Sequence, residues 1–240
     1  MVACAAAARE YGAVLTTFTE VQGIETAGEK ILSVQTTAGR IKTDTIINAA
    51  GVWAPFIAQM VGLELPVAPL KGELLVTERR PPQMTGTLIA AKYLKSKSSL
   101  EGGRSGGPPQ RSVGITLVQV AHGNFIVGST REQAADDRRS TYGGVHELVR
   151  QLLDLTPCLA DVHLLRAYAG LRPITPDGYP IIGRAPQLPG FILASGFGGD
   201  GLAMSAISAE MILSILQDQP DEELLKPFSP ERFQLSKATS

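Results

Sequence analysis

The residues best suited to chemistry lie in a glycine-rich stretch near the end of the chain. Gly196, Gly198 and Gly201 follow the apolar run GFILAS and have the spacing G-x-G-x-x-G. In dinucleotide-binding proteins such glycines let a strand turn sharply into a helix and let backbone amides approach a pyrophosphate. That use also needs a second strand bearing an acidic residue for the ribose, but the helix here is followed by the polar residues 217–233. A pyrophosphate-binding unit therefore cannot be completed from this stretch.

The glycine-rich stretch can still bind a ligand through the N-terminus of the helix that follows it. Asp200 is placed to cap its first turn, and the amides at this end carry a partial positive charge. Such an end favours an anionic or electron-rich ligand atom. The alternative is that the glycines serve only a tight turn and close packing.

Two other segments offer groups to a ligand. In TIINAAGVWAP a strand ends at Ala49, Ala50 and Gly51, so residues with almost no side chain lie where a loop could meet a cofactor. In AGLRPIT, Arg172 is held extended by the following proline, and its guanidinium could donate a fork of hydrogen bonds to a carboxylate. Simple packing and a surface ion pair are the alternatives for these segments.

Periodicity and turn residues predict the elements that would position these groups. Helices are expected before Gly12 and over 53–61, 145–155 and 201–216. Short strands fill 14–51, and strands of an antiparallel sheet are expected at 66–78, 85–94, 113–121 and 123–130. The Gly/Ser/Pro-rich residues 95–112 are expected to form a surface loop, and the polar tail is expected to cover the surface.

Composition excludes several classes of protein. The 240 residues, 44% hydrophobic and 19% charged, are typical of a globular protein with a sizeable core. A net charge of −1 without charge blocks argues against nucleic acid or anionic lipid as a partner. No apolar run reaches the roughly 18 residues of a membrane span and no signal peptide is recognisable, so a cytoplasmic protein is expected. Cys4, Cys158 and the three histidines show no metal-ligand spacing, and both cysteines are expected to be buried.

The chain resembles the D-amino-acid oxidase-like family of FAD-dependent oxidoreductases, which includes glycine and sarcosine oxidases and proline or hydroxyproline dehydrogenases. The resemblance rests on six segments in family order: TFTEVQGI, TDTIINAAGVWAP, PVAPLKGELLVTE, GNFIVGSTREQAADDRRST, AGLRPITPDGYPIIG and GFGGDGLAMSAISAEMI. It covers nearly the whole chain. The segments STRE…DDRRST and GGDGLAMS are most similar to the amine or imino-acid dehydrogenase branch. It implies FAD as cofactor and oxidation of the CH–N bond of an amino acid or secondary amine by hydride transfer to flavin N5.

The resemblance also implies an α/β fold, in which the C-terminal portion of a Rossmann-like FAD-binding domain joins an antiparallel-sheet substrate domain. Residues 1–65 and 169–217 would belong to the FAD domain, 66–168 to the substrate domain and 218–240 to a C-terminal tail. By position, Arg172 would bind the substrate carboxylate. The residues that would contact FAD are Val21, Ala49, Ala50, Gly51, Trp53, Gly198, Gly199, Asp200, Gly201, Leu202 and Ala203.

Two departures from the family pattern carry consequences. Glycine oxidase has a second substrate arginine where this chain has Gly199, so glycine itself is a less expected substrate. Family members also begin with a glycine fingerprint that this sequence does not contain, so the chain is expected to be truncated or to receive that region from a partner chain. On its own it is then expected to bind FAD weakly or not at all. The alternative function is a non-catalytic remnant or a partner-binding subunit of an amine dehydrogenase.

Overall fold

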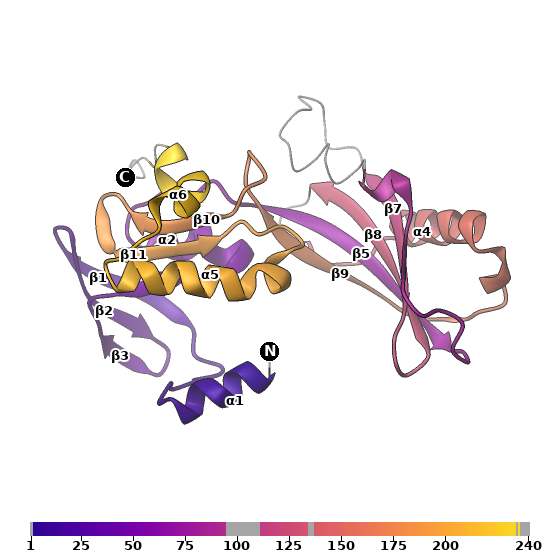
Figure 1. The fold of residues 1–240 in the computed structure, drawn as a ribbon, viewed down its shortest axis with the longest axis horizontal. Coiled ribbons are helices and arrows are strands. Elements are labelled where there is room, and N and C mark those ends of the chain that lie inside the picture. The colour runs from indigo at the N-terminus through magenta and orange to yellow at the C-terminus, as the bar shows by residue number, and fades with distance from the viewer. Residues whose placement is uncertain (1, 95–110, 134–136, 234, 236–240) are drawn as a thin grey trace.

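The computed structural model describes residues 2–94, 111–133, 137–233 and 235. The described strands form three sheets, in the orders β1-β2-β3, β10-β11-β4 and β6-β7-β8-β5-β9. In Figure 1 the first two sheets and most helices lie together, and the long strands β5 and β9 lead from them into the third sheet. The predicted α/β class with a large antiparallel sheet is confirmed.

The first sheet is a meander of β1 (Val21–Ala27), β2 (Lys30–Thr36) and β3 (Gly39–Lys42). Gly28 and Gly39 adopt φ of +61° and +119° at its two turns, which is the region that favours glycine. Helix α1 (Val2–Glu10) precedes this sheet and has no buried residue. The helix predicted before Gly12 is thus confirmed, and Gly12 follows it with φ +90°.

The second sheet is enclosed between helices. It contains β4 (Ile46–Asn48), β10 (Ile181–Ala185) and β11 (Leu188–Ser195), with β11 parallel to β4 and antiparallel to β10. Side chains alternate along β11, so Phe191 and Leu193 pack with helix α2 (Ala54–Gln59) while Ile192 packs with helix α5 (Gly201–Leu216). Because β4 and β11 are parallel, their carboxyl ends meet at one edge of the sheet.

The third sheet is covered on one face by helix α4 (Tyr142–Leu155). Leu75, Val127, Leu148 and Leu152 form part of the core between them. Its strands are β5 (Ala68–Arg79), β6 (Thr87–Ile89), β7 (Ser112–Gln119), β8 (Asn124–Gln133) and β9 (Leu164–Ile174). Thr141 caps α4 by accepting a hydrogen bond from the Gly144 amide, which starts the helix earlier than predicted.

The tail contributes to the core as well as to the surface. After helix α6 (Glu222–Leu225) come two 3-10 turns, Lys226–Phe228 and Pro230–Phe233. Leu235 is buried in the cluster around β10 and β11. The Arg232 guanidinium donates to the Asp177 carboxylate and also to the Tyr179 carbonyl oxygen. These contacts fix the tail against the predicted turn at residues 176–178.

Three expectations from the sequence are wrong or lie outside the described residues. The strand predicted over 85–94 is confined to Thr87–Ile89, and residues 91–94 are helical. Cys4 and Cys158 are exposed rather than buried. Most of the loop predicted over 95–112 lies outside the described residues.

No helix in the described part of the chain is long and apolar enough to cross a bilayer.

Candidate functional site

Arg172 lies across the third sheet rather than pointing away from it. The pairing of β5 with β9 places Leu70 opposite Arg172 and Gly72 opposite Gly170. The guanidinium donates from Nη2 to the Ser129 hydroxyl at 2.8 Å and from Nη1 to the Thr130 carbonyl oxygen at 3.4 Å. A Cβ at Gly72 would lie 2.5 Å from Cζ of Arg172 and closer still to both Nη atoms. Glycine at position 72 therefore makes room for the guanidinium.

A buried polar network supports this arrangement from the α4 side of the sheet. The Glu73 amide donates to the Thr130 hydroxyl at 2.8 Å, and the Glu73 carboxylate accepts from the Thr141 hydroxyl at 2.9 Å. Lys71 Nζ lies 3.5 Å from the same carboxylate, and the two side chains are 3% and 0% exposed. A Cβ at Gly144 would lie 2.6 Å from Cδ of Glu73, so α4 begins with a glycine where the carboxylate fits. The network links the start of α4 to the strand that contacts Arg172.

Arg139 holds the carboxyl group of Asp137 in its ionised form. Hydrogen bonds from the side chain and backbone of Arg139 lower the pKa of Asp137 to about 2, and the positive charge of Lys71 adds a smaller effect. Asp137 is thus ionised at neutral pH. The described residues contain no cluster of histidine, cysteine, aspartate and glutamate suited to a metal ion.

The glycine-rich loop before α5 lies directly against Arg172. Gly196 and Gly198 adopt φ of +83° and +56°, and the Gly198 amide donates to the Pro173 carbonyl oxygen at 2.7 Å. A Cβ at Gly199 would lie 3.6 Å from Nε of Arg172. Gly201 starts α5, where Leu202 is 71% exposed and Ala203 is exposed. The structure therefore brings the loop and the arginine together.

The predicted side-chain cap of α5 is wrong. Asp200 occupies the N-cap position, but its side chain forms no capping hydrogen bond. Its φ of −103° and ψ of 3° differ from the extended conformation that lets a capping side chain reach back to the helix amides. The first amides of α5 are consequently not engaged by the Asp200 carboxylate.

The segment from Ala49 to Trp53 lies at the carboxyl edge of the second sheet, where β11 ends and the glycine-rich loop begins. The Asn48 side chain donates to the Ala54 carbonyl oxygen at 2.8 Å and accepts from the Ala50 amide at 3.3 Å, which shapes the turn into α2. Gly51 has φ +58°, accepts from the Ser195 hydroxyl at 2.8 Å, and has no described atom within 4 Å of a Cβ position. The 3-10 helix Gly51–Trp53 contacts β9. Trp53 is half-exposed, so this edge presents small residues and one indole.

Val21 is not brought to this edge. It lies in β1, in a separate sheet, and no hydrogen bond of the described residues joins β1 to the glycine loop or Arg172. Among the predicted site residues it is thus the one set apart from the others.

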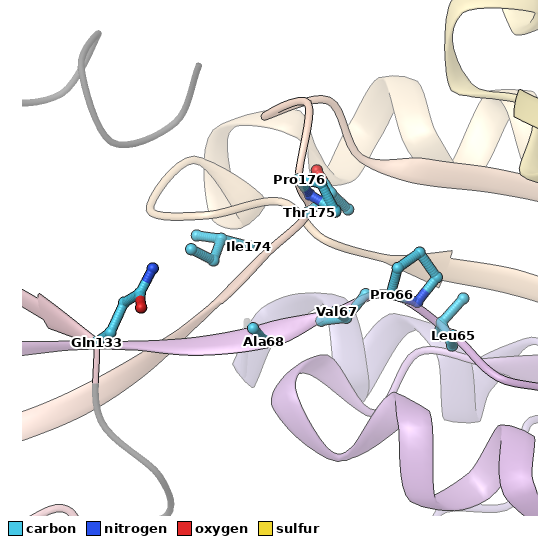
Figure 2. A pocket seen from close by; sticks show the side chains of 8 residues that line it. All are labelled: Leu65, Pro66, Val67, Ala68, Gln133, Ile174, Thr175 and Pro176. Atoms are coloured by element: carbon cyan, nitrogen blue, oxygen red, sulfur yellow. The ribbon is translucent and has the colours of Figure 1, made fainter. Parts of the chain in front are cut away.

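A cavity of about 360 Å³ opens where β5 begins and β9 ends (Figure 2). It is lined by Leu65, Pro66, Val67, Ala68, Gln133, Ile174, Thr175 and Pro176. Ala68 pairs with Ile174 two residue pairs along the ladder from the pair of Leu70 and Arg172. None of the predicted site residues lines it. Its walls come from three separate segments that only strand pairing brings together, so spacing in the sequence offers no signal for it.

Comparison with known proteins decides the family. The family model described as FAD dependent oxidoreductase, DAO, matches residues 1–215. The chain belongs to the DAO family of FAD-dependent oxidoreductases. The resemblance drawn from the six sequence segments is therefore confirmed, and FAD is the cofactor of this family.

Relatives within the DAO family share about half of their length with this chain. Hydrogen cyanide synthase subunit HcnC of Pseudomonas protegens is 32% identical over 228 residues, which are 94% of this chain and 49% of the relative. Glycine oxidase of Geobacillus kaustophilus is 28% identical over 230 residues, 96% of this chain and 55% of the relative. The structure of L-proline dehydrogenase from P. horikoshii superposes with a TM-score of 0.84 at 29% identity, covering 97% of this chain and 58% of that one.

Proposed function

We propose that this chain carries the substrate arginine and the flavin-ring side of an enzyme that oxidises the CH–N bond of a carboxylate-bearing amine or amino acid. The observation that carries the proposal is the contact between Arg172 and the glycine loop, where a Cβ at Gly199 would lie 3.6 Å from Nε. A carboxylate bound by the guanidinium would therefore be held beside the start of α5. Relatives named glycine oxidase and L-proline dehydrogenase make an amino acid the favoured substrate class.

The residues at this edge fit a flavin. Gly51 and Gly199 leave room beside the backbone, and α5 presents its first amides without a capping hydrogen bond from the Asp200 side chain. By family position, Ala49, Ala50, Gly51 and Trp53 would lie along FAD, residues 198–203 would hold the pyrimidine edge of its ring system, and Val21 would contact its adenine side. FAD held by these residues would supply the acceptor for the hydride that leaves the substrate carbon.

The chain's own residues would supply binding, orientation and electrostatic stabilisation. Arg172 would hold the carboxylate in one orientation, and such positioning can supply much of a rate enhancement. Amides at the N-terminus of α5 would stabilise negative charge at an adjacent electron-rich group, as in an oxyanion hole. Ser129 and Thr130, by accepting from the guanidinium, would keep it from turning away.

A further segment would complete the FAD site in this proposal. Within the described residues β4 pairs with β11 on one side only, so its other edge is available to a strand. We infer that a region resembling the unmatched half of the relatives, on the same or a partner polypeptide, occupies that edge. Without it the chain is expected to bind FAD weakly.

A second candidate is a partner-binding subunit without its own catalysis. The relative HcnC is named as a subunit of hydrogen cyanide synthase, and helix α1 has no buried residue. Supplying the complementary region and following flavin absorbance with proline, sarcosine and D-amino acids separates the two candidates. Reduction of the flavin by one of these amines supports the enzyme, and its absence with bound FAD supports the subunit.

The role of Arg172 is tested in the enzyme reconstituted from this chain, the complementary region and FAD. Arg172→Ala is expected to raise KM for carboxylate substrates by about 10- to 100-fold, because charge-assisted hydrogen bonds are lost. Arg150→Ala is the matched control, since Arg150 pairs with Glu147 on the exposed side of α4. An unchanged KM in Arg172→Ala would remove this residue from the site.

A further inference from the structure

Arg166 and Arg172 lie on the same open face of the third sheet. Leu75 packs against α4, so residues 70 and 76 of β5 project to the opposite face. Arg172 pairs directly with the first of these and Arg166 with the second, and directly paired residues share a face. The described strand residues that share this face between the two pairs are glycine, leucine and tyrosine, so none of them is acidic.

The two guanidinium groups extend toward each other along β9. The Arg172 group lies over Gly72, which pairs with Gly170, so it is displaced toward Tyr168 from its own place in the ladder. The Arg166 group lies over the Tyr168 ring, with Cζ 6.0 Å from the ring centre, and is displaced in the opposite direction. Positions 168 and 170 are roughly 7 Å apart along a strand. Both cations are therefore presented to one short stretch of surface.

Arg166 is available to a ligand. Its side chain is exposed, and no carboxylate in the described part of the chain forms an ion pair with it. Arg150 is also exposed but pairs with Glu147. The Tyr168 ring beside Arg166 is 37% exposed, so it leaves the guanidinium open to solvent on this face. An anion at Arg166 would accept charge-assisted hydrogen bonds from a planar fork of donors.

We propose that Arg166 binds a second anionic group of the substrate, so that the enzyme acts on amines that carry two carboxylates. This inference rests on the proposed function and deepens it, because it specifies the substrate class. Two carboxyl carbons separated by four single bonds of about 1.5 Å lie roughly 5 Å apart, and a hydrogen bond of about 3 Å extends the reach at each end. Such a molecule spans from Arg172 to Arg166, with its amine between the two carboxylates.

The test uses the full chain with glutarate and butyrate as probes, and dissociation constants are measured by ligand-observed NMR. Both acids are unbranched, and glutarate alone has a second carboxylate, four bonds from the first. Glutarate is expected to bind about tenfold more tightly than butyrate, because its second carboxylate gains charge-assisted hydrogen bonds. Arg166→Gln is expected to lower glutarate affinity to that of butyrate and to leave butyrate affinity unchanged. An equal loss for both acids would count against the inference, since it would show a general disturbance of this face.

Arg150→Gln is the matched control. It removes the same charge from an exposed position on α4 and is expected to retain the preference for glutarate. Equal affinities for the two acids in the wild type, or an unchanged preference in Arg166→Gln, would overturn the inference and leave the proposed function standing. Undiminished binding of both acids in Arg172→Ala, or no binding of either acid by the wild type, would overturn the carboxylate contact of the proposed function and this inference with it.

Discussion

Replacing Gly72 with alanine should displace Arg172 without unfolding the protein. The new Cβ would lie 2.5 Å from Cζ of Arg172. Carbon atoms in contact prefer about 3.5 to 4.0 Å, so the guanidinium must move by about 1 Å. Moving away from Ser129 by that amount would stretch their 2.8 Å hydrogen bond to roughly 3.8 Å, beyond hydrogen-bond range.

The effect on the reaction should exceed the effect on stability. A 1 Å misplacement of a positioning group can cost on the order of 100-fold, so kcat/KM for a carboxylate substrate is expected to fall about 30- to 100-fold. Loss of the bond to Ser129 should lower the free energy of unfolding by only about 1 to 2 kcal/mol.

The assay is steady-state kinetics of the enzyme reconstituted with the complementary region and FAD, together with urea unfolding of the chain. Gly23→Ala, in a strand with no close neighbour, is the control. Wild-type kcat/KM in Gly72→Ala would refute the reasoning, because it would mean that the position of the guanidinium does not matter.

Two further predictions concern buried and partly buried carboxylates. Glu73→Gln leaves Lys71 without its buried counter-charge and should lower the free energy of unfolding in urea by about 3 to 5 kcal/mol, so a change below about 1 kcal/mol would contradict the network. Burial raises the pKa of Asp177, but hydrogen bonds from Arg232 and the Tyr179 amide outweigh it and the net pKa is lowered. Its contribution should therefore be full above about pH 5 and vanish as pH falls through the lowered pKa, which unfolding of wild type and Asp177→Asn across pH measures. A difference between them that grows as the pH falls would show the opposite sign.

Local signals in the sequence were sufficient for much of the fold. The apolar run GFILAS followed by glycines predicts the strand and helix that the structure contains as β11 and α5. The stretch PVAPLKGELLVTE predicts β5, and the PDG turn forms with φ +79° at Gly178. These elements depend on residues close in sequence, so propensity and periodicity suffice.

Features that depend on contacts between distant segments could not be predicted from the sequence. Lys71 and Glu73 alternate with apolar residues, a pattern that places charges on the exposed side of a strand, yet they are buried because Thr141 and α4 lie over them. Residues 91–94 read as a continuation of a strand but are helical where Tyr93 packs against Gly114. The position of Arg172 over Gly72 follows from strand register, which spacing cannot supply.

The single register pair of Ala68 with Ile174 marks both the entrance and the exit of the five-stranded sheet. The other strands of this sheet and helix α4 lie between these two residues in the chain, so the two ends of the segment lie side by side. Antiparallel partners lie about 5 Å apart, so a short link could rejoin the two ends. The five-stranded sheet could therefore be exchanged as one unit with that of a relative, which would replace the surface that carries Arg172 while retaining the sheet of β4, β10 and β11.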